Sequence, residues 1–407
     1  MSRSTAMLVL TISSLWVAGC GSDRTDEVAP VPSDARSGLA APPPELGIQL
    51  RQQFGPLEPG MEVHYCQYYV LPERAVDVQR FEHTYSFGGH HLVVYPTKKS
   101  PQDVVSRAQA FDCNEEPTRA HLGVSYFGAG VSNGYAYPEG VAWRFEANSV
   151  VLLEVHMLNL GDTPLSFEGR VNLWYATKPV RDLVGTIFFY DQHIYLEPAG
   201  RFSARMQCQV PRDIHVLSLT PHMHVRGRRF ASQLVGGDGS MPVTLVGTED
   251  WSELELTNYT PTLEVSAGQH FEISCDYENP DPTPIIEGQS KNKNEMCQLL
   301  GSYYPKLDFR FEFCMTGGSG AVFDGDKSCG DTLNCFLGAT DPVSAEKCTV
   351  QTCARSSEAF NEFYSCLTLQ CFFPGPCAAD SSSSDCKRCT VESCRSQMQA
   401  CYATGCE

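Results

Sequence analysis

Nineteen cysteines in a chain of 407 residues constrain how this protein folds more than any other feature of its sequence. Six of them are scattered between Cys66 and Cys314, whereas twelve crowd into residues 323–407. Cysteine at this density is typical of exported proteins in an oxidising compartment and would be unusual in a reducing cytosol. The rise in cysteine content also predicts a domain boundary near Phe323.

Residues 323–407 form a predicted cysteine-rich tail that contains a short internal repeat. The repeat consists of Lys347–Cys353 and Arg388–Cys394, and each copy is followed by another Cys-x4-Cys pair, Cys366 with Cys371 and Cys401 with Cys406. The helical composition of Ala354–Tyr364 predicts disulfide-stapled helical hairpins, whose connectivity the sequence leaves open. Zinc binding is the alternative for Cys386 and Cys389, but the prevailing spacing and the oxidising compartment favour disulfides.

The first twenty residues are predicted to be an export signal. Arg3 lies in a short polar start, and the apolar run that follows is too short for a stable membrane span. The run ends in Val17-Ala18-Gly19-Cys20, which resembles the lipobox of bacterial lipoproteins, so we expect a lipid at Cys20. Gly21 follows where an aspartate would indicate inner-membrane retention, which favours an outer-membrane anchor with the protein on the periplasmic or surface face. An ordinary secretory signal is the alternative.

Composition supports two further expectations, one for the region after the signal and one for the whole chain. Residues 21–46 are rich in Pro, Ala, Ser and Asp and have no apolar periodicity, which predicts a disordered tether. The formal net charge of the chain is -18. A nucleic-acid partner is not expected, because such a protein needs a basic surface to neutralise phosphates.

Short β-type runs separated by turn residues fill positions 47–322. They predict an all-β fold of two tandem antiparallel, jelly-roll-like β-sandwich domains, over residues 47–179 and 180–322. The strands predicted in the first domain cover residues 61–70, 90–95, 141–145, 149–156 and 171–175. Those predicted in the second cover residues 183–189, 201–210, 215–219, 228–234, 243–246, 268–277 and 308–314.

A His-x-His pair, His222 and His224, follows the β-type run 214–219. On an extended strand, residues two apart point to the same face, with Cα atoms roughly 7 Å apart, so both imidazoles can chelate one metal ion. A strand would also hold the pair rigidly. The alternative is that the two histidines merely line one face of a strand.

Three further histidines and one methionine complete the candidate metal ligands. His90 and His91 follow Gly88-Gly89, His156 ends the apolar run from Val150, and Met296 lies in Asn294–Cys297. Adjacent histidines on a regular strand point to opposite faces, so His90 and His91 can share a metal only if the backbone departs from ideal pleating, which the glycines permit. Singly, each residue is explained as core or strand surface. Together, imidazoles and a thioether suit copper.

With these residues in place, the sequence resembles the copper type II, ascorbate-dependent monooxygenases, the family of peptidylglycine α-hydroxylating monooxygenase and dopamine β-monooxygenase. The matching stretches follow the family's order over most of residues 60–318. They are Tyr65-Cys66, His90-His91, Pro138–Ala142, Leu153–His156, Cys208, Ile214–Val216, His222–His224, Glu295–Cys297, Tyr303–Pro305 and Phe313–Gly318.

The resemblance implies two copper ions in separate sites. An electron-transfer copper would be held by His90, His91 and His156, and an oxygen-activating copper by His222, His224 and Met296. The implied reaction hydroxylates a C–H bond of an unidentified small molecule or peptide with O2, and ascorbate or another reductant supplies the electrons. The family pattern also implies the disulfides Cys66–Cys113, Cys208–Cys314 and Cys275–Cys297.

Departures from the family pattern concern the substrate. Thr220 and Leu300 stand where the peptide-amidating member has an arginine and a tyrosine that hold the peptide carboxylate, so peptidylglycine is not the expected substrate. Solvent exposure is expected for Arg226, Arg228 and Arg229. The remaining histidines have no ligand match and are expected to be structural or exposed: His64, His83, His121, His193, His215 and His270.

Two other functions are compatible with the sequence. A copper-binding lipoprotein that stores, senses or delivers the metal without catalysis would keep the same ligands. A purely structural surface protein that uses its stapled tail for contacts would bind no stoichiometric copper.

Overall fold

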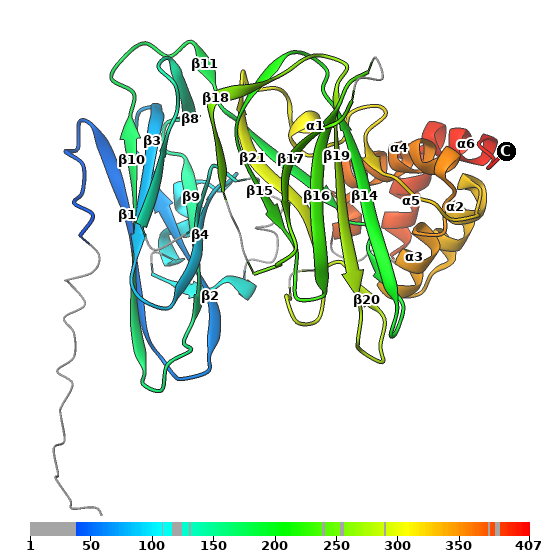
Figure 1. Cartoon of the computed structure of the whole chain (residues 1–407), viewed down its shortest axis with the longest axis horizontal. Coiled ribbons are helices and arrows are strands. Elements are labelled where there is room, and N and C mark those ends of the chain that lie inside the picture. The colour runs from blue at the N-terminus through cyan, green and yellow to red at the C-terminus, as the bar shows by residue number, and fades with distance from the viewer. Residues whose placement is uncertain are drawn as a thin grey trace, which may run out of the picture.

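The computed structural model describes residues 38–107, 109–115, 124–129, 132–237, 241–252, 256–288, 290–372, 375–378 and 383–407. The predicted signal, Cys20, most of the predicted tether and His121 lie outside these ranges. Within them the chain forms two β-layered halves followed by a helical tail, which lie from left to right in Figure 1. No helix of the described ranges is long and apolar enough to cross a membrane.

Two sheets pack face to face in the first half. The six-stranded sheet has the order β1 (Gly47–Leu57), β10 (Leu165–Tyr175), β3 (Val76–Tyr85), β8 (Val141–Phe145) and β11 (Asp182–Leu183), with β7 (Ser132–Ala136) also paired to β3. The five-stranded sheet has the order β5 (Phe111–Asp112), β2 (Glu62–Val70), β9 (Val150–Leu158), β4 (Gly89–Pro96) and β6 (Tyr126–Ala129). The buried core between them includes Leu50, Phe81, Leu92, Leu153 and Val171.

The second half repeats this architecture. One sheet has the order β12 (Gly185–Asp191), β21 (Cys297–Tyr304), β15 (Ile214–His222) and β18 (Thr257–Val265). The other has the order β17 (Val243–Thr248), β16 (Gly227–Val235), β19 (His270–Glu278), β14 (Arg201–Gln209) and β22 (Gly320–Ala321). A small ribbon pairs β13 (Tyr195–Leu196) with β20 (Ile285–Ile286). In β19, Phe271, Ile273, Cys275 and Tyr277 alternate into the core, as period-2 strand geometry requires.

The predicted fold class is confirmed: the sheets are antiparallel, apart from the parallel pair β8–β11, and the helical, disulfide-rich part is confined to the C-terminal end. The strand predicted over residues 308–314 is wrong, because Phe309–Glu312 is helix α1. The Asp308 side chain caps this helix by accepting from the Phe311 amide. The rings of Phe309 and Phe313, four residues apart, stack at 4.3 Å between centroids.

The two sandwiches are packed against each other. A register shift between Val216 and Ser218 in β15 frees Leu217 to pack into the core of the first sandwich. The Tyr135 hydroxyl donates to the Leu217 carbonyl at 3.4 Å, and Thr186 Oγ1 donates to the Val124 carbonyl at 2.7 Å. Strand β11 pairs with β8 of the first half, although its residues lie within the range predicted for the second domain. These contacts fix the outer faces of two sheets opposite each other.

Three disulfides staple the β-region. Cys66–Cys113 ties β2 to a short 3-10 helix, Cys208–Cys314 ties β14 to the segment after α1, and Cys275–Cys297 ties β19 to the first residue of β21. They are the three pairs that the family resemblance implies. The last of them fixes the residue that follows Met296.

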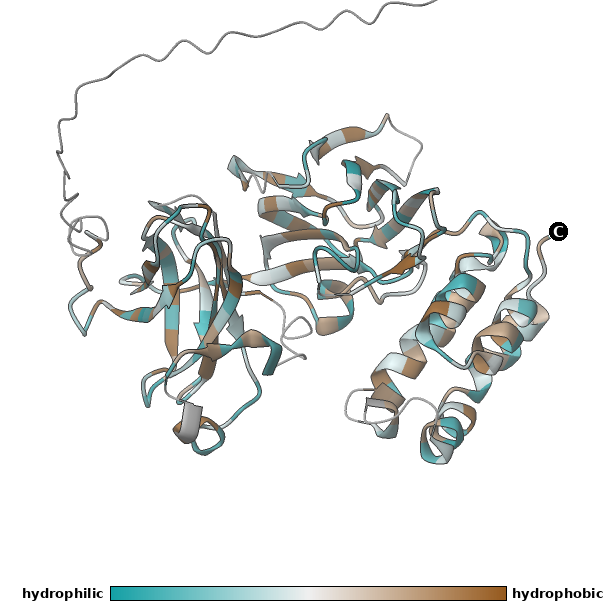
Figure 2. Cartoon of the chain, turned by 90° about the horizontal axis from the view of Figure 1, so that it is seen from below, coloured by the Kyte–Doolittle hydropathy of each residue, from teal (hydrophilic) through white to brown (hydrophobic). Residues whose placement is uncertain are grey.

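Six more disulfides hold the tail helices together. The helices are α2 (Cys329–Gly338), α3 (Pro342–Thr349), α4 (Ser357–Leu367), α5 (Ser384–Ser393) and α6 (Arg395–Ala403). The disulfides are Cys335–Cys348, Cys366–Cys394, Cys371–Cys389, Cys377–Cys386, Cys329–Cys401 and Cys353–Cys406. Figure 2 shows the helices as a bundle beside the second sandwich, with apolar and polar residues interspersed along each helix.

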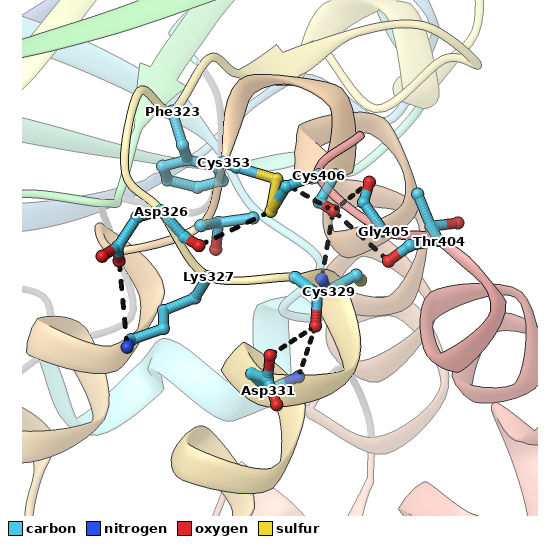
Figure 3. The surroundings of a disulfide bond; sticks show 12 residues. Phe323, Asp326, Lys327, Cys329, Asp331, Cys353, Thr404, Gly405 and Cys406 are labelled. Atoms are coloured by element: carbon cyan, nitrogen blue, oxygen red, sulfur yellow. Dashed lines mark hydrogen bonds and ion pairs between the residues drawn. A yellow bond between two sulfur atoms is a disulfide. The ribbon is translucent and has the colours of Figure 1, made fainter.

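The pairing pattern explains how the tail is built. Three consecutive bridges, Cys366–Cys394, Cys371–Cys389 and Cys377–Cys386, join two antiparallel segments as the rungs of one hairpin. Figure 3 shows Cys353–Cys406, which closes the end of the chain onto the bundle next to Thr404 and Gly405. Because Cys386 and Cys389 bond to different partners, the zinc alternative for this pair is wrong in this structure.

The tail is docked firmly on the second sandwich. Strand β22 continues the sheet of β14, and Asn361 on α4 donates to the Ala321 carbonyl at 2.8 Å. At the centre of the junction, His193 Nδ1 lies 3.1 Å from a carboxylate oxygen of Glu346 on α3. Asp191 is buried beside this pair and accepts from the His193 amide at 2.9 Å.

Non-reducing peptide mapping of protein from an oxidising export host should recover Cys371 linked to Cys389 and Cys377 linked to Cys386. The reason is that each pair has its sulfur atoms already bonded in the folded tail. The same digest after reduction serves as the control, since the linked peptides should then disappear. Stoichiometric zinc, with Cys386 and Cys389 becoming alkylatable once the metal is chelated, would contradict this pairing.

The buried junction makes stability depend on pH. Burial raises the pKa of Asp191 to about 7. Folded protein therefore keeps a proton that the unfolded chain has already released, and stability falls as pH rises from about 4 through 7. Asp191→Asn should become more stable relative to the unchanged protein over this range, by about 1–3 kcal/mol at pH 8. Denaturation at several pH values measures the difference.

Asp213→Asn is the matched control, because Asp213 also accepts from a backbone amide, that of Ala267 at 2.8 Å, but is exposed to solvent. Its stability relative to the unchanged protein should not vary between pH 5 and 8. A parallel pH profile for both variants would refute the assignment to Asp191.

Candidate metal centre

A cavity of about 120 Å³ lies between the facing sheets of the two sandwiches. All six predicted metal ligands line it: His90, His91, His156, His222, His224 and Met296. Much of the remaining wall is apolar, and includes Val93, Val124, Phe127, Phe188 and Leu300. The structure therefore brings together side chains that lie more than two hundred positions apart in the sequence.

Strand alternation places His156 on this cavity. Residues Val151, Leu153 and Val155 of β9 point into the core of the first sandwich. Glu154 and His156 point to the opposite face of the sheet, toward the second sandwich, and both are buried there. A strand that is buried on both faces, as β9 is, marks the side of the sandwich that meets another layer.

A β-bulge allows the adjacent His90 and His91 to face the same cavity. The pairing of β4 with β9 shifts register between Gly89 and His91, as the predicted departure from regular pleating requires. The Nδ1 atoms of the two histidines lie 3.0 Å apart. Gly89 is needed at this point, because an added Cβ would lie 2.3 Å from the Tyr85 ring.

His156 completes a cluster of three imidazoles. Ligand nitrogens of His90, His91 and His156 all lie within 4.8 Å of one another. His156 Nε2 lies 2.8 Å from a carboxylate oxygen of Glu62, whereas its Nδ1 is buried without a hydrogen-bond partner among the described residues. A buried nitrogen with an unused lone pair is costly unless it binds something. His156 Nδ1 is therefore suited to hold a metal ion together with nitrogens of His90 and His91.

These imidazoles are kept in the form that binds metals. Burial lowers the pKa of His91 well below its usual range and that of His156 to about 4. Neighbouring histidines, whose positive charges would repel, lower both values further. The rings are therefore neutral near pH 7, and a neutral imidazole has the lone pair that coordinates a metal.

His64 was expected to be structural or exposed, but it belongs to this site. Its ring stacks on His156 at 4.0 Å between centroids, and its Nδ1 lies 2.7 Å from a carboxylate oxygen of Glu154. Glu62, His64 and His156 form a second group whose potential ligand atoms lie within 4.8 Å. The register that sets His64 opposite His156 joins β2 to β9 and has no local signal in the sequence.

His222 and His224 form the second cluster, with ring centroids 5.3 Å apart. The prediction that both lie on a strand is correct for His222 only, because β15 ends there and His224 lies in the following loop. His224 Nδ1 lies 3.1 Å from the Asn294 carbonyl, to which it donates, so Nε2 remains for a metal. Burial lowers the pKa of His222 to about 3 and that of His224 to about 4.

Met296 is buried and fixed from several sides. Its carbonyl accepts from the Tyr277 hydroxyl at 2.7 Å, and the disulfide of Cys297 follows directly. Glu295, on its other side, accepts from the amides of His224 at 3.0 Å and Arg226 at 2.7 Å. One carboxylate thus joins the segment that carries Met296 to the segment that carries His224.

The expectation that Arg226 is solvent-exposed is wrong. Its side chain is 7% exposed, and its Nε donates to Asp281 at 3.0 Å, while Nη1 lies 3.8 Å from Glu295. A register shift between Gly227 and Arg229 changes the strand pattern here. Arg228 and Arg229 are exposed, as predicted. Arg226 therefore stabilises the loop behind His224 and is not available to a substrate.

Comparison of the sequence with known proteins finds a matching family model and a human relative. Residues 187–325 match the family model described as copper type II ascorbate-dependent monooxygenase, C-terminal domain. A human protein named DBH-like monooxygenase protein 2 is 22% identical over 237 residues, which are 53% of this chain and 47% of that protein. The chain thus spans about half the length of this curated relative.

Both comparisons support the copper type II ascorbate-dependent monooxygenase family. The range that matches the model of these monooxygenases contains His222, His224 and Met296. The family is copper- and ascorbate-dependent by its description, which supports copper and ascorbate in general terms.

Comparison with solved structures adds no functional argument. The major capsid protein P2 of bacteriophage PM2 is 9% identical, with 64% of this chain and 99% of that chain covered and a TM-score of 0.25. The stem and receptor-binding domain of the spike protein P1 of the same phage is 11% identical, with 63% and 96% covered and a TM-score of 0.12. Scores this low do not establish a shared fold.

Glu295→Ala should lower the free energy of unfolding of the metal-free protein by about 2–4 kcal/mol, because it leaves two buried amides and part of the Arg226 guanidinium without their acceptor. Chemical denaturation measures this loss. Glu278→Ala is the control, because Glu278 is 46% exposed and its ion pairs among the described residues are with the surface arginines Arg201 and Arg228, and it should change stability by less than about 0.5 kcal/mol. Equal losses for the two variants would contradict the role given to Glu295.

Proposed function

We propose that this protein is a copper-dependent monooxygenase that hydroxylates a C–H bond of an organic substrate with O2 and ascorbate or another reductant. The observation that carries the proposal is that all six predicted ligands, five imidazoles and one thioether, line a single cavity. In such a reaction one oxygen atom enters the C–H bond and the other leaves as water, with two electrons and two protons from the reductant.

The donor atoms fit two copper ions of different character. His90, His91 and His156 would hold one, and three imidazoles serve both oxidation states of copper. His222, His224 and Met296 would hold the other, where the soft thioether favours Cu(I). When bound, the coppers would pass on the electrons of the reductant and supply the oxygen activation that no amino-acid side chain offers.

The protein's own part is to orient ligands and exclude water. Glu62 and the Asn294 carbonyl each bind the nitrogen of a histidine that the metal does not need, which fixes the ring and leaves the other nitrogen free. Glu62 also pairs with Lys291, so a residue of each half meets at the rim of the site. The apolar walls limit the water that reaches a reactive centre.

The surroundings of the second cluster guide the choice of substrate. Thr220 is buried and Leu300 lines the cavity, so neither offers a positive charge or a phenol to a carboxylate. Arg226 is committed to Asp281 and Glu295. A substrate held by a terminal carboxylate is therefore disfavoured.

We also propose that this protein is exported and anchored to a membrane by lipid. Nine disulfides in the described residues indicate an exported protein. Together with the lipobox-like sequence at Cys20, they support an enzyme anchored by lipid to the outer membrane and exposed to the periplasm or the cell surface.

Met296→Ile should reduce reductant-dependent O2 consumption at least about tenfold, because the thioether is lost while the histidines stay. Metal analysis of the same protein should still find copper at the histidine cluster. Oxygen uptake is measured with ascorbate against a panel of amines, peptides and phenols. Met241→Ile is the matched control, because Met241 is 86% exposed and its loss should change nothing.

Other outcomes would favour other functions. Tight copper binding without O2 consumption under any reductant would replace the enzyme by a protein that stores, senses or delivers copper. A purified chain without stoichiometric copper would exclude both and favour a structural surface protein.

A further inference from the structure

A second and much larger cavity, of about 670 Å³, borders the metal cavity. It lies between the second sandwich, the edge of the first and the tail. Its wall includes Phe309 and Phe313 at helix α1, and Tyr364, Thr368 and Leu369 of the tail. A cavity of this size can bury most of the surface of a drug-sized organic molecule. The metal cavity, at about 120 Å³, is too small for that.

The two cavities share a wall. Val124 and Phe188 line both of them. Phe188 also belongs to one buried apolar cluster with Tyr190, Leu300 and the predicted ligand Met296, and Phe313 packs against this cluster. A molecule in the large cavity is therefore separated from the metal-binding side chains by a single layer of apolar groups.

The tail forms its part of the wall as a rigid element. The Phe323 amide donates to Ser357 Oγ at 3.0 Å where the tail begins. Disulfides Cys366–Cys394 and Cys371–Cys389 flank the turn of chain that carries Thr368 and Leu369. A wall that is held by covalent bonds on both sides keeps its shape whether or not a ligand is present.

The charges on the wall are already matched within the protein. Glu312 accepts from the Thr186 amide at 3.1 Å and pairs with Lys306 at 3.6 Å. Asp191 accepts from the His193 amide, and His193 pairs with Glu346. Lys98, the fifth charged residue on the wall, is exposed to solvent. What the cavity presents to a ligand is mainly aromatic and aliphatic surface.

We propose that this cavity binds a bulky, uncharged, apolar molecule, and that the tail is part of the binding site. The inference rests on the proposed function in one respect: the bound molecule is the substrate, and the carbon that is hydroxylated enters the metal cavity past Phe188. Burial of apolar surface supplies its affinity without any charged contact.

Binding is tested first without copper. The neutral, apolar dye Nile red is titrated into the metal-free full chain, and fluorescence reports its uptake. Leu369→Trp fills the cavity from the tail side and should weaken Nile red binding at least tenfold. Leu337→Trp makes the same change on helix α2, where Leu337 is 40% exposed and outside the cavity, and should leave binding unchanged.

A second filling variant, Thr368→Trp, guards against misfolding of the first, and non-reducing mapping of the tail disulfides shows that each variant is folded. Loss of Nile red binding in both filling variants supports the proposal. Undiminished binding in a folded Leu369→Trp or Thr368→Trp protein overturns it.

The link to catalysis is tested with copper-loaded protein. Leu369→Trp should lose O2 consumption driven by apolar substrates while ascorbate still reduces its bound copper. His222→Ala should lose O2 consumption yet bind Nile red normally. If Nile red binds as expected but copper does not bind, the proposed function fails and the apolar site stands. If apolar substrates are oxidised equally by Leu369→Trp, the proposed function stands and this site fails.

Discussion

The contact between the outer faces of two sheets is the interaction on which the site depends. The core of each sandwich consists mainly of its own residues, whereas the face of β9 that carries Glu154 and His156 lines a cavity that both sandwiches enclose. Leu217 makes this contact specific, since a bulge turns it out of its own sandwich and into the core of the first. Without that closure the imidazoles would be hydrated, and burial would no longer hold them neutral.

Much of the fold follows from local pattern. Runs such as Ser149–His156 and 268–277 are apolar or alternating, and they form β9 and β19. Strand β21 was not predicted from the sequence, because Gly301 lies within it and glycine normally weakens a strand. The structure shows why glycine is there: a Cβ at Gly301 would lie 2.2 Å from the Ser218 carbonyl, where the bulged β15 approaches most closely. Only a tertiary contact explains that residue.

The candidate site was partly accessible from sequence for a related reason. The predicted ligands that stand in short motifs, the adjacent His90 and His91 and the His-x-His pair His222 and His224, were recognised by their spacing and by resemblance to a family. His64 and Glu62 were not, because their closeness to His156 arises from the register of β2 on β9. The solvent exposure of Arg226 was predicted wrongly, because its partners, Asp281 and Glu295, lie in loops more than fifty positions away in the sequence. Residues that support a site from a distance leave no local pattern.

The disulfides of the tail contribute both to its stability and to the shape of the proposed binding site. Its helices are short and enclose a small apolar core, in which Phe360 and Phe363 are the large buried side chains, so burial alone is a weak source of stability. Six disulfides compensate by restricting the unfolded chain. The same bridges fix Thr368 and Leu369 at the edge of a cavity that reaches the cluster around Met296. The disulfides that keep the tail folded therefore also make it rigid enough to shape a binding site.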